Sequence, residues 1–291
     1  MQRKLTILDY ITCLGILALL GFILFRLGYS LNYKWNWSII PTYLVNIDPQ
    51  TGAWTSGVLL QGLFTTIKLS IWGTLLAALL GSIVGLLSIS RKLFRRLCAK
   101  TYVESIRNIP ALVLVFLFYY FVSDQIMPIL HIDEISRSLS QKNNSLFVLL
   151  FSSPETIRQF LSGVITLGLF QGAYIAEIVR GGIQAIDKGQ WESSSAVGLN
   201  RWQQMRLVIL PQAIRNMLPP LANEFINTIK YSSIVSIISI QELTFQGMQV
   251  MASTQVTIEV WLTITALYLI LCLLLSYGVT LLEHKLSQFK S

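Results

Sequence analysis

Six apolar runs, separated by polar segments, dominate the hydrophobic pattern of this chain. A helix needs about 20 consecutive apolar residues to cross the hydrocarbon core of a bilayer. Backbone polar groups inside a bilayer must be paired within the segment itself, which favours helices. The pattern therefore predicts an all-α polytopic membrane protein with spans at approximately 8–28, 60–88, 105–127, 159–180, 207–229 and 260–282.

The first run could also be a secretory signal peptide, because Arg3 and Lys4 precede it. No small-x-small cleavage site follows its end at Phe25, so we predict an uncleaved transmembrane helix. Another apolar stretch, 146–152, is too short to cross and is expected on the outer surface or against the bundle. The predicted domains are an N-terminal helix with its outer loop (1–57), a transmembrane domain (58–283) that contains the inner loop 181–211, and a cytoplasmic tail (284–291).

Composition supports the membrane assignment and predicts an orientation. Hydrophobic residues make up 53% of the chain and charged residues 12%, against about 25% charged in soluble domains. With the N-terminus inside, the inner segments hold thirteen Lys and Arg and the outer segments six, which predicts that both termini are cytoplasmic. This bias accounts for the net charge of +8, and no nucleic-acid partner is expected. Cys13, Cys98 and Cys272 have no metal-ligand spacing, so no metal site is expected.

The inner loop between the fourth and fifth predicted spans carries a distinctive order of residue types. Glu192 comes near the start of a short predicted helix, where a negative charge interacts favourably with the helix dipole. Small side chains follow as far as Ala196 and would let a partner surface approach closely. Gly198 permits a backbone angle closed to other residues, and Pro211 marks the start of the next span. An ordinary amphipathic cytoplasmic loop is the alternative.

The order Glu192–Ser194, then Gly198, then Ile209–Pro211 resembles the cytoplasmic coupling motif of ABC importer permeases. The usual motif reads Glu-Ala-Ala, three residues, Gly and later Ile-x-Leu-Pro, so serines replace both alanines here. In that family the loop sits in a groove on a separate ATPase and transmits its motion. The resemblance implies an ATPase-coupling segment with the candidate residues Trp191, Glu192, Ser193, Ser194, Ala196, Gly198 and Pro211.

Flanking motifs narrow the resemblance. They lie at 102–110, 173–184, 219–226 and 230–234. Together they are similar to the polar amino acid uptake permeases, the histidine/glutamine/arginine group, over about residues 58–283. The resemblance implies a type I ABC importer permease fold with a five-helix core, to which the first span adds one N-terminal helix.

The same resemblance implies partners. They are a cytoplasmic ABC ATPase dimer, a second permease that is identical or related, an extracytoplasmic amino acid-binding protein and the lipid bilayer of the inner membrane. The sequence contains no Gly-x-x-x-x-Gly-Lys-Ser/Thr motif. No cofactor is therefore expected in this chain, and ATP is expected on the partner ATPase.

Charged and kinked positions inside the spans indicate the substrate path. Ionisable residues in a bilayer usually face the bundle interior or a wet cavity. Glu224 follows Pro219-Pro220, where missing backbone donors favour a kink, and could bind a substrate ammonium group or pair with a cation across the bundle. Glu104 and Arg107, three residues apart, are expected to pair with each other.

The family resemblance implies that the third and fifth spans line a central cavity. Carried over position by position, the candidate substrate-path residues are Asn108, Ile109, Pro110, Glu224 and Ser232. The chain departs from the family at 107–110 and at 230–233, both within the expected path. Tyr231 replaces a residue that is often acidic, which favours a substrate that is not strictly cationic.

Two other function classes are open at this point. An ion-coupled secondary amino acid transporter would need ion-coordinating groups at broken helices, and Pro219-Pro220 with Glu224 could serve in that way. A membrane-embedded enzyme has less support, because His131 and His284 are isolated from other catalytic residue types. The resemblance favours a transport subunit that is not itself an enzyme.

Overall fold

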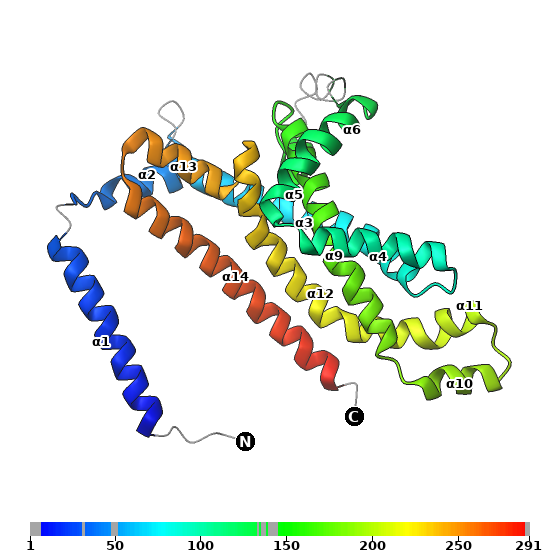
Figure 1. Cartoon of the computed structure of the whole chain (residues 1–291). Helices are drawn as coiled ribbons and strands as arrows, with labels where there is room; N and C mark the ends of the chain where they lie inside the picture. Colours follow the sequence, from blue (N-terminus) through cyan, green and yellow to red (C-terminus); the bar gives the residue numbers. More distant parts are fainter. Residues whose placement is uncertain are drawn as a thin grey trace. The chain divides into compact units, whose positions relative to one another are not determined.

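A computed structural model describes residues 7–30, 33–47, 52–132, 134, 138 and 145–288. It divides into two compact units, residues 1–38 and 39–291, which are considered separately. The first unit holds one long helix, α1 (Ile7–Ser30), drawn in blue in Figure 1. Most of its described side chains are exposed and apolar, which suits contact with lipid.

The second unit is built almost entirely from helices. A short turn, η1 (Trp37–Ile39), leads into it. Its elements are α2 (Ile40–Leu44), β1 (Val45–Ile47), β2 (Trp54–Ser56), α3 (Val58–Ser88), α4 (Leu93–Asn108), α5 (Ala111–Leu117), η2 (Phe118–Ser123), α6 (Asp124–Ile129), α8 (Ser145–Leu150), α9 (Ile157–Gln184), α10 (Lys188–Ala196), α11 (Arg201–Gln203), η3 (Gln204–Ile209), α12 (Leu210–Ser232), η4 (Ser233–Ile238), α13 (Leu243–Thr254) and α14 (Thr257–Gln288).

Four helical stretches in the described part of the chain are long and apolar enough to cross a membrane. They are α3, residues 111–129, α9 and residues 257–281 of α14. Three of them match the predicted spans at 60–88, 159–180 and 260–282. The helix α12 covers most of the predicted span 207–229 but is not among the four, since many polar side chains interrupt it. Crossing by α1 and α12 therefore stays a prediction.

The predicted single span at 105–127 is wrong in detail, because the chain breaks there into two helices. The helix α4 ends at Asn108, and α5 begins after Pro110. Proline disfavours helical backbone in the residue before it, and Ile109 is extended with φ −99° and ψ 139°. The hydrophobic pattern runs through this break, which is why pattern alone joined the two helices.

The helices α3 and α9 lie against each other at very short distance, and glycine makes this possible. A Cβ atom on Gly81 would lie 2.7 Å from Ile175 Cβ, and one on Gly85 would lie 2.7 Å from Val179 Cβ. The same holds for a glycine of α9: a Cβ atom on Gly168 would lie 2.6 Å from Leu76 Cδ2 of α3. Lipid tails are as apolar as these side chains, so close packing stabilises such a pair in a bilayer more than burial from water does.

The helix α9 is the most buried of the long apolar helices, and it contributes to three hydrophobic clusters of the second unit. It contacts α3, α4 and α12. Phe160 and Leu167 belong to a cluster near its start, and Ile175 and Ile183 to a cluster near its end. Side chains on α9 are therefore held from several sides, which makes this helix a fixed reference for the elements around it.

The short apolar stretch 146–152 packs against the bundle, and one small element was not predicted. The expected stretch 146–152 contains α8, whose following residue Phe151 stacks on Trp72 of α3 with ring centroids 4.7 Å apart. The unpredicted element is an antiparallel hairpin in which β1 pairs with β2, with Asn46 opposite Thr55. The fold is otherwise all-α, as the pattern predicts.

Candidate functional site: the inner loop and the α4–α12 region

The helix α10 has a sequence-encoded start and end. Its N-cap is Asp187, whose Oδ1 accepts the backbone N–H of Gly189 at 2.6 Å. At the other end Gly198 has φ +84°, in the left-handed region that favours glycine. The Gly198 N–H donates to Ser195 O at 3.0 Å, and the Leu199 N–H donates to Ser194 O at 3.2 Å. This bond pair is a Schellman termination, so the predicted special angle at Gly198 is present.

The candidate coupling residues of α10 lie on two different faces. Glu192, Ser193 and Ala196 are exposed and available to a partner. Ser194 is buried, and its hydroxyl donates to Trp191 O at 2.9 Å. The Trp191 ring packs against the cluster that contains residues of α9 and α12. The small side chain at position 194 therefore allows packing within the chain. The outward face of α10 is formed by Glu192, Ser193 and Ala196.

Side-chain hydrogen bonds brace the turn between α10 and α11. Asn200 and Gln203 form a reciprocal capping box, with Asn200 Oδ1 accepting the Gln203 N–H at 3.0 Å. The buried Gln204 donates from Nε2 to Ser195 Oγ and to Leu199 O, both at 2.8 Å. These bonds tie the end of α10 to the start of η3, so the loop is held as one piece.

Two exposed apolar side chains flank this turn and were not singled out from the sequence. Val197 is 80% exposed and Trp202 is 70% exposed. Both side chains are therefore available for contact with another molecule. The sequence feature that could have indicated their exposure is their position on either side of Gly198, in a segment without hydrophobic periodicity.

The loop is connected directly to the start of α12. Pro211 is the second residue of α12, which follows directly after the π-helical turn η3, and the helical backbone runs without a break from Arg201 into α12. Just before it, the N–H of Leu210 donates to Met205 O in a π-helical turn. Gln212 Nε2 donates to Gln190 Oε1 of α10 at 3.1 Å. A displacement of α10 would therefore reach α12 through both packing and hydrogen bonds.

The first group of predicted path residues lies at the break between α4 and α5. Asn108, Ile109 and Pro110 are all exposed in the single chain. Asn108 Nδ2 donates to Glu104 O at 2.8 Å and so caps the end of α4. The break between α4 and α5 therefore exposes one polar side chain, Asn108, next to the apolar side chains of Ile109 and Pro110.

Glu224 is buried and is held by amides. Gln171 of α9 donates from Nε2 to Glu224 Oε1 and to Thr228 Oγ1, both at 3.0 Å. Asn227 Nδ2 donates to Glu224 Oε2 at 3.3 Å. No lysine or arginine within the described ranges forms an ion pair with Glu224. The carboxylate is therefore neither an ion-pair partner nor freely open in this conformation.

Ser232 is buried, whereas Asn108, Ile109 and Pro110 are exposed. Its side chain is fully buried, and its hydroxyl donates to Ile229 O of the same helix at 2.7 Å. The neighbouring Tyr231 ring packs edge-on against Phe170 with centroids 5.1 Å apart. Ser232 is therefore closed off from solvent in the single chain.

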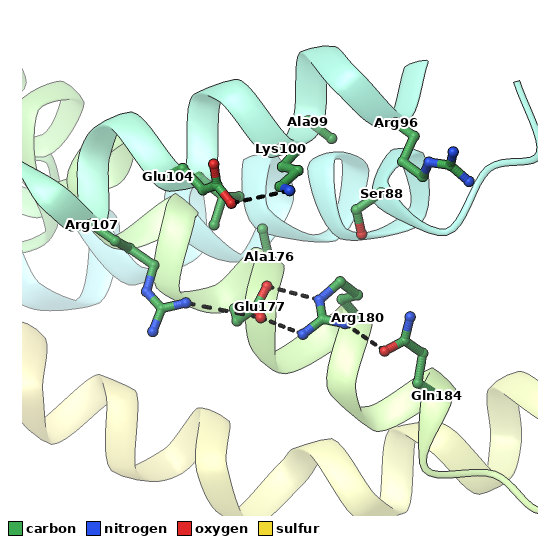
Figure 2. Close-up of a pocket in the computed structure, with 11 residues that line it drawn as sticks. Ser88, Arg96, Ala99, Lys100, Glu104, Arg107, Ala176, Glu177, Arg180 and Gln184 are labelled. Carbon is green, nitrogen blue, oxygen red and sulfur yellow. Dashed lines mark hydrogen bonds and ion pairs between the residues drawn. The ribbon is translucent and has the colours of Figure 1, made fainter. Parts of the chain in front are cut away.

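The expected pair between Glu104 and Arg107 is replaced by two other pairs (Figure 2). Arg107 Nη1 lies 3.9 Å from Glu177 Oε1, and Arg180 also binds the Glu177 carboxylate with two nitrogens. Glu104 pairs with Lys100 at 3.5 Å. The spacing rule allows pairing within α4, but packing against α9 offers Arg107 a carboxylate on a neighbouring helix.

A second buried carboxylate belongs to Glu242, the N-cap residue of α13. Its Oε1 accepts the Phe245 N–H at 2.8 Å, and its Oε2 accepts the Tyr268 hydroxyl at 2.7 Å. Burial raises the pKa of Glu242 to about 7, although these donors act in the opposite direction. Glu242 thus fixes the start of α13 against α14.

The described part of the chain holds no group of three or more His, Cys, Asp or Glu side chains arranged to bind a metal ion.

Comparison with known proteins places these features in a family. Residues 73–288 match the family described as binding-protein-dependent transport system inner membrane component. The glutamine transport system permease protein GlnP of Escherichia coli K12 is 34% identical over 223 residues, which cover 75% of this chain and 90% of that protein. The probable glutamine ABC transporter permease protein GlnM of Bacillus subtilis is 35% identical over 187 residues, covering 64% of this chain and 74% of that protein.

A solved structure agrees with the predicted fold. The chain is similar to one from the crystal structure of an amino acid ABC transporter with histidines, with 31% identity and a TM-score of 0.67. The match covers 87% of this chain and 100% of that chain. The type I ABC importer permease fold inferred from the sequence is thereby confirmed, and the chain belongs to the family of inner membrane components of binding-protein-dependent transport systems.

Proposed function

We propose that this permease component forms the translocation pathway of an ATP-driven importer for polar amino acids of the glutamine class. The relatives named as glutamine permeases, and the similar chain from an amino acid ABC transporter, support this cargo class. The chain works as a transport component of the inner membrane and is not an enzyme. An extracytoplasmic binding protein would deliver the amino acid to the end of α12 that leads into α13.

The braced loop from Glu192 to Pro211 carries this proposal. Its outward face, formed by Glu192, Ser193 and Ala196 with the exposed Val197 and Trp202, fits contact with a separate protein. A cytoplasmic ABC ATPase dimer is the partner that supplies ATP hydrolysis. The distribution of Lys and Arg supports a cytoplasmic position for this loop and for both termini.

The loop can transmit motion because hydrogen bonds across the turn hold α10 and η3 together. Gln204 ties α10 to η3, and Gln190 is bonded to Gln212 at the start of α12. When the ATPase subunits close, α10 would move as a piece and displace the inner end of α12. Since α12 also holds Glu224, its displacement would change the surroundings of that carboxylate.

A second permease, identical or related, would complete the pathway. Asn108, Ile109 and Pro110 are exposed at the α4–α5 break, and Pro220 and Asn223 are exposed on α12. Polar and kinked positions are unsuited to lipid contact. Facing a second copy across a shared path, they would line a polar route, with the Glu224 carboxylate freed from Gln171 to accept a substrate ammonium group.

Uptake by the reconstituted complex tests the proposal. The complex of permease, ATPase and binding protein is placed in vesicles, and glutamine uptake and retained ATPase are measured for Glu192→Lys. We expect roughly 10- to 100-fold weaker ATPase retention, because a charge is reversed at a protein contact. The control is Glu155→Lys, the same charge change on the exposed outer segment before α9. Full ATPase retention and full uptake by Glu192→Lys would contradict the coupling role.

A further inference from the structure

A cavity of about 360 Å³ opens beside the inner half of α9, between the end of α3 and the helix α4 (Figure 2). Four cationic side chains line it: Arg96, Lys100 and Arg107 from α4, and Arg180 from α9. Two carboxylates, Glu104 and Glu177, also line it. Four positive and two negative charges leave the cavity with a surplus of two positive charges.

The ion pairs do not use all of these cations. Glu177 is shared by Arg180 and Arg107, and Glu104 is paired with Lys100. Figure 2 shows Arg96 at the α3 side of the cavity, and no carboxylate of the described segments pairs with it. The guanidinium group of Arg96 is therefore available to an anion from outside the chain.

The positive surface continues into a second cavity of about 560 Å³. The two cavities share Arg96, and the second adds Arg91, Lys188 and Arg201 without any carboxylate in its lining. Arginine guanidinium groups match phosphate oxygens with paired hydrogen bonds. Together the cavities favour a group with phosphate chemistry over a neutral or cationic ligand.

The exposed side of α4 adds an apolar surface directly beside the cationic row. Arg96, Lys100 and Arg107 are spaced by four and seven residues, so they follow one stripe along the helix. Leu93 and Leu97 lie three residues before Arg96 and Lys100 and form the adjacent stripe. Both leucines are exposed, and Phe94 next to them is 78% exposed. A free phosphate would use the cations and leave this apolar stripe uncovered.

We propose that this cavity binds the phosphate headgroup of an anionic phospholipid, with the acyl chains against Leu93, Phe94 and Leu97. A helix with basic residues beside exposed Leu and Phe side chains is the arrangement found at membrane interfaces. Basic pockets between helices at the cytoplasmic side bind acidic headgroups. Arg96 and Lys100 are neither candidate substrate-path residues nor candidate coupling residues, so binding of a lipid at these side chains goes beyond the transport role.

Native mass spectrometry of the full chain, purified in detergent, tests this site. The probes are phosphatidylglycerol, phosphatidylcholine and inorganic phosphate, each added separately and phosphate also added as a competitor. The site variant is Arg96→Gln/Lys100→Gln. The matched control is Lys92→Gln/Arg95→Gln, which removes two positive charges from exposed positions of the same segment outside the cavity lining.

We expect the wild type to retain phosphatidylglycerol and not phosphatidylcholine. Each basic side chain near an anionic lipid contributes about fivefold in affinity, so the site variant should bind about 30-fold more weakly. The control variant should bind as the wild type does, and all variants should melt at the same temperature.

Three results would overturn the proposal. Equal losses in the site and control variants would mean that only diffuse positive charge attracts the lipid. Displacement of the lipid by millimolar inorganic phosphate would mean that the cavity selects a free anion. The third result has two parts: the wild-type dimer retains no phosphatidylglycerol, and the site variant forms fewer dimers than the wild type. Together they would mean that a second copy of the chain covers this face.

Discussion

Replacing Gly198 tests the coupling segment where its backbone is most constrained. The residue has φ +84°, and a Cβ atom added to it would meet nothing within 4 Å. A substitution at this position therefore strains the backbone without creating a clash. Relief of the strain would break the two bonds that end α10, from Gly198 to Ser195 and from Leu199 to Ser194.

The expected magnitude follows from the cost of left-handed backbone. For residues other than glycine this conformation costs about 1–2 kcal/mol, which lowers the population of the native turn by about 5- to 30-fold. Gly198→Val should show the largest effect, because a β-branched residue is least tolerant of positive φ. Gly198→Asn should show the smallest, since asparagine visits this region most readily.

Binding of the purified ATPase to the detergent-solubilised permease provides the assay. Affinity should fall in the order Gly, Asn, Ala, Val at position 198, while helix content and membrane insertion remain unchanged. Equal affinity for Gly198→Val and the wild type would refute the reasoning. An equal loss for Asn and Val would point to a side-chain clash with the partner and would also contradict it.

Three further predictions concern packing, the path and pH. Gly81→Ala should lower the melting temperature in detergent by an amount that corresponds to about 1–3 kcal/mol, because the new Cβ atom meets Ile175 at 2.7 Å; Gly181→Ala, with open space around it, is the control and should not destabilise. Glu224→Gln can keep only one of the two amide contacts, because its NH2 group cannot accept a hydrogen bond; it should keep ATPase binding but lower glutamine uptake at least tenfold, and unchanged uptake would exclude a role for the charge in the path. Because the pKa of Glu242 is raised to about 7 in the folded chain, its protonated form contributes stability below the ordinary carboxyl pKa, and this contribution is lost as the pH rises through about 7. Melting temperatures between pH 5 and pH 8 should therefore fall more steeply for the wild type than for Glu242→Gln, and parallel curves for the two would be the contrary result.

Features that depend on one residue type at one position could be predicted from the sequence. The need for glycine at position 198 is an example, since few other residues satisfy its backbone conformation. The long apolar spans at α3, α9 and α14 were predictable for the same reason, because length and hydrophobicity alone define them.

Features that depend on distant neighbours could not be predicted. Gln171, which holds Glu224, lies 53 residues earlier in the chain. Arg107 pairs with Glu177 on another helix although Glu104 stands within reach on its own. In the short helix α10 the small side chains give no periodicity, so the sequence could not show that Ser194 faces inward while Ser193 faces outward.

The central claim is that the segment from Glu192 to Pro211 docks on an ATPase, and a crosslink from Val197 tests it most directly. Val197→Cys is introduced into a chain whose three native cysteines are replaced by serine and is labelled with a short photoreactive group. It is irradiated in membranes that contain the complete transporter, and the adducts are identified by mass spectrometry. Val197 is 80% exposed at the end of α10, so we predict an adduct with the ATPase that is formed in high yield. Adducts with lipid or with the permease alone, in a transporter that still imports its amino acid, would contradict the claim.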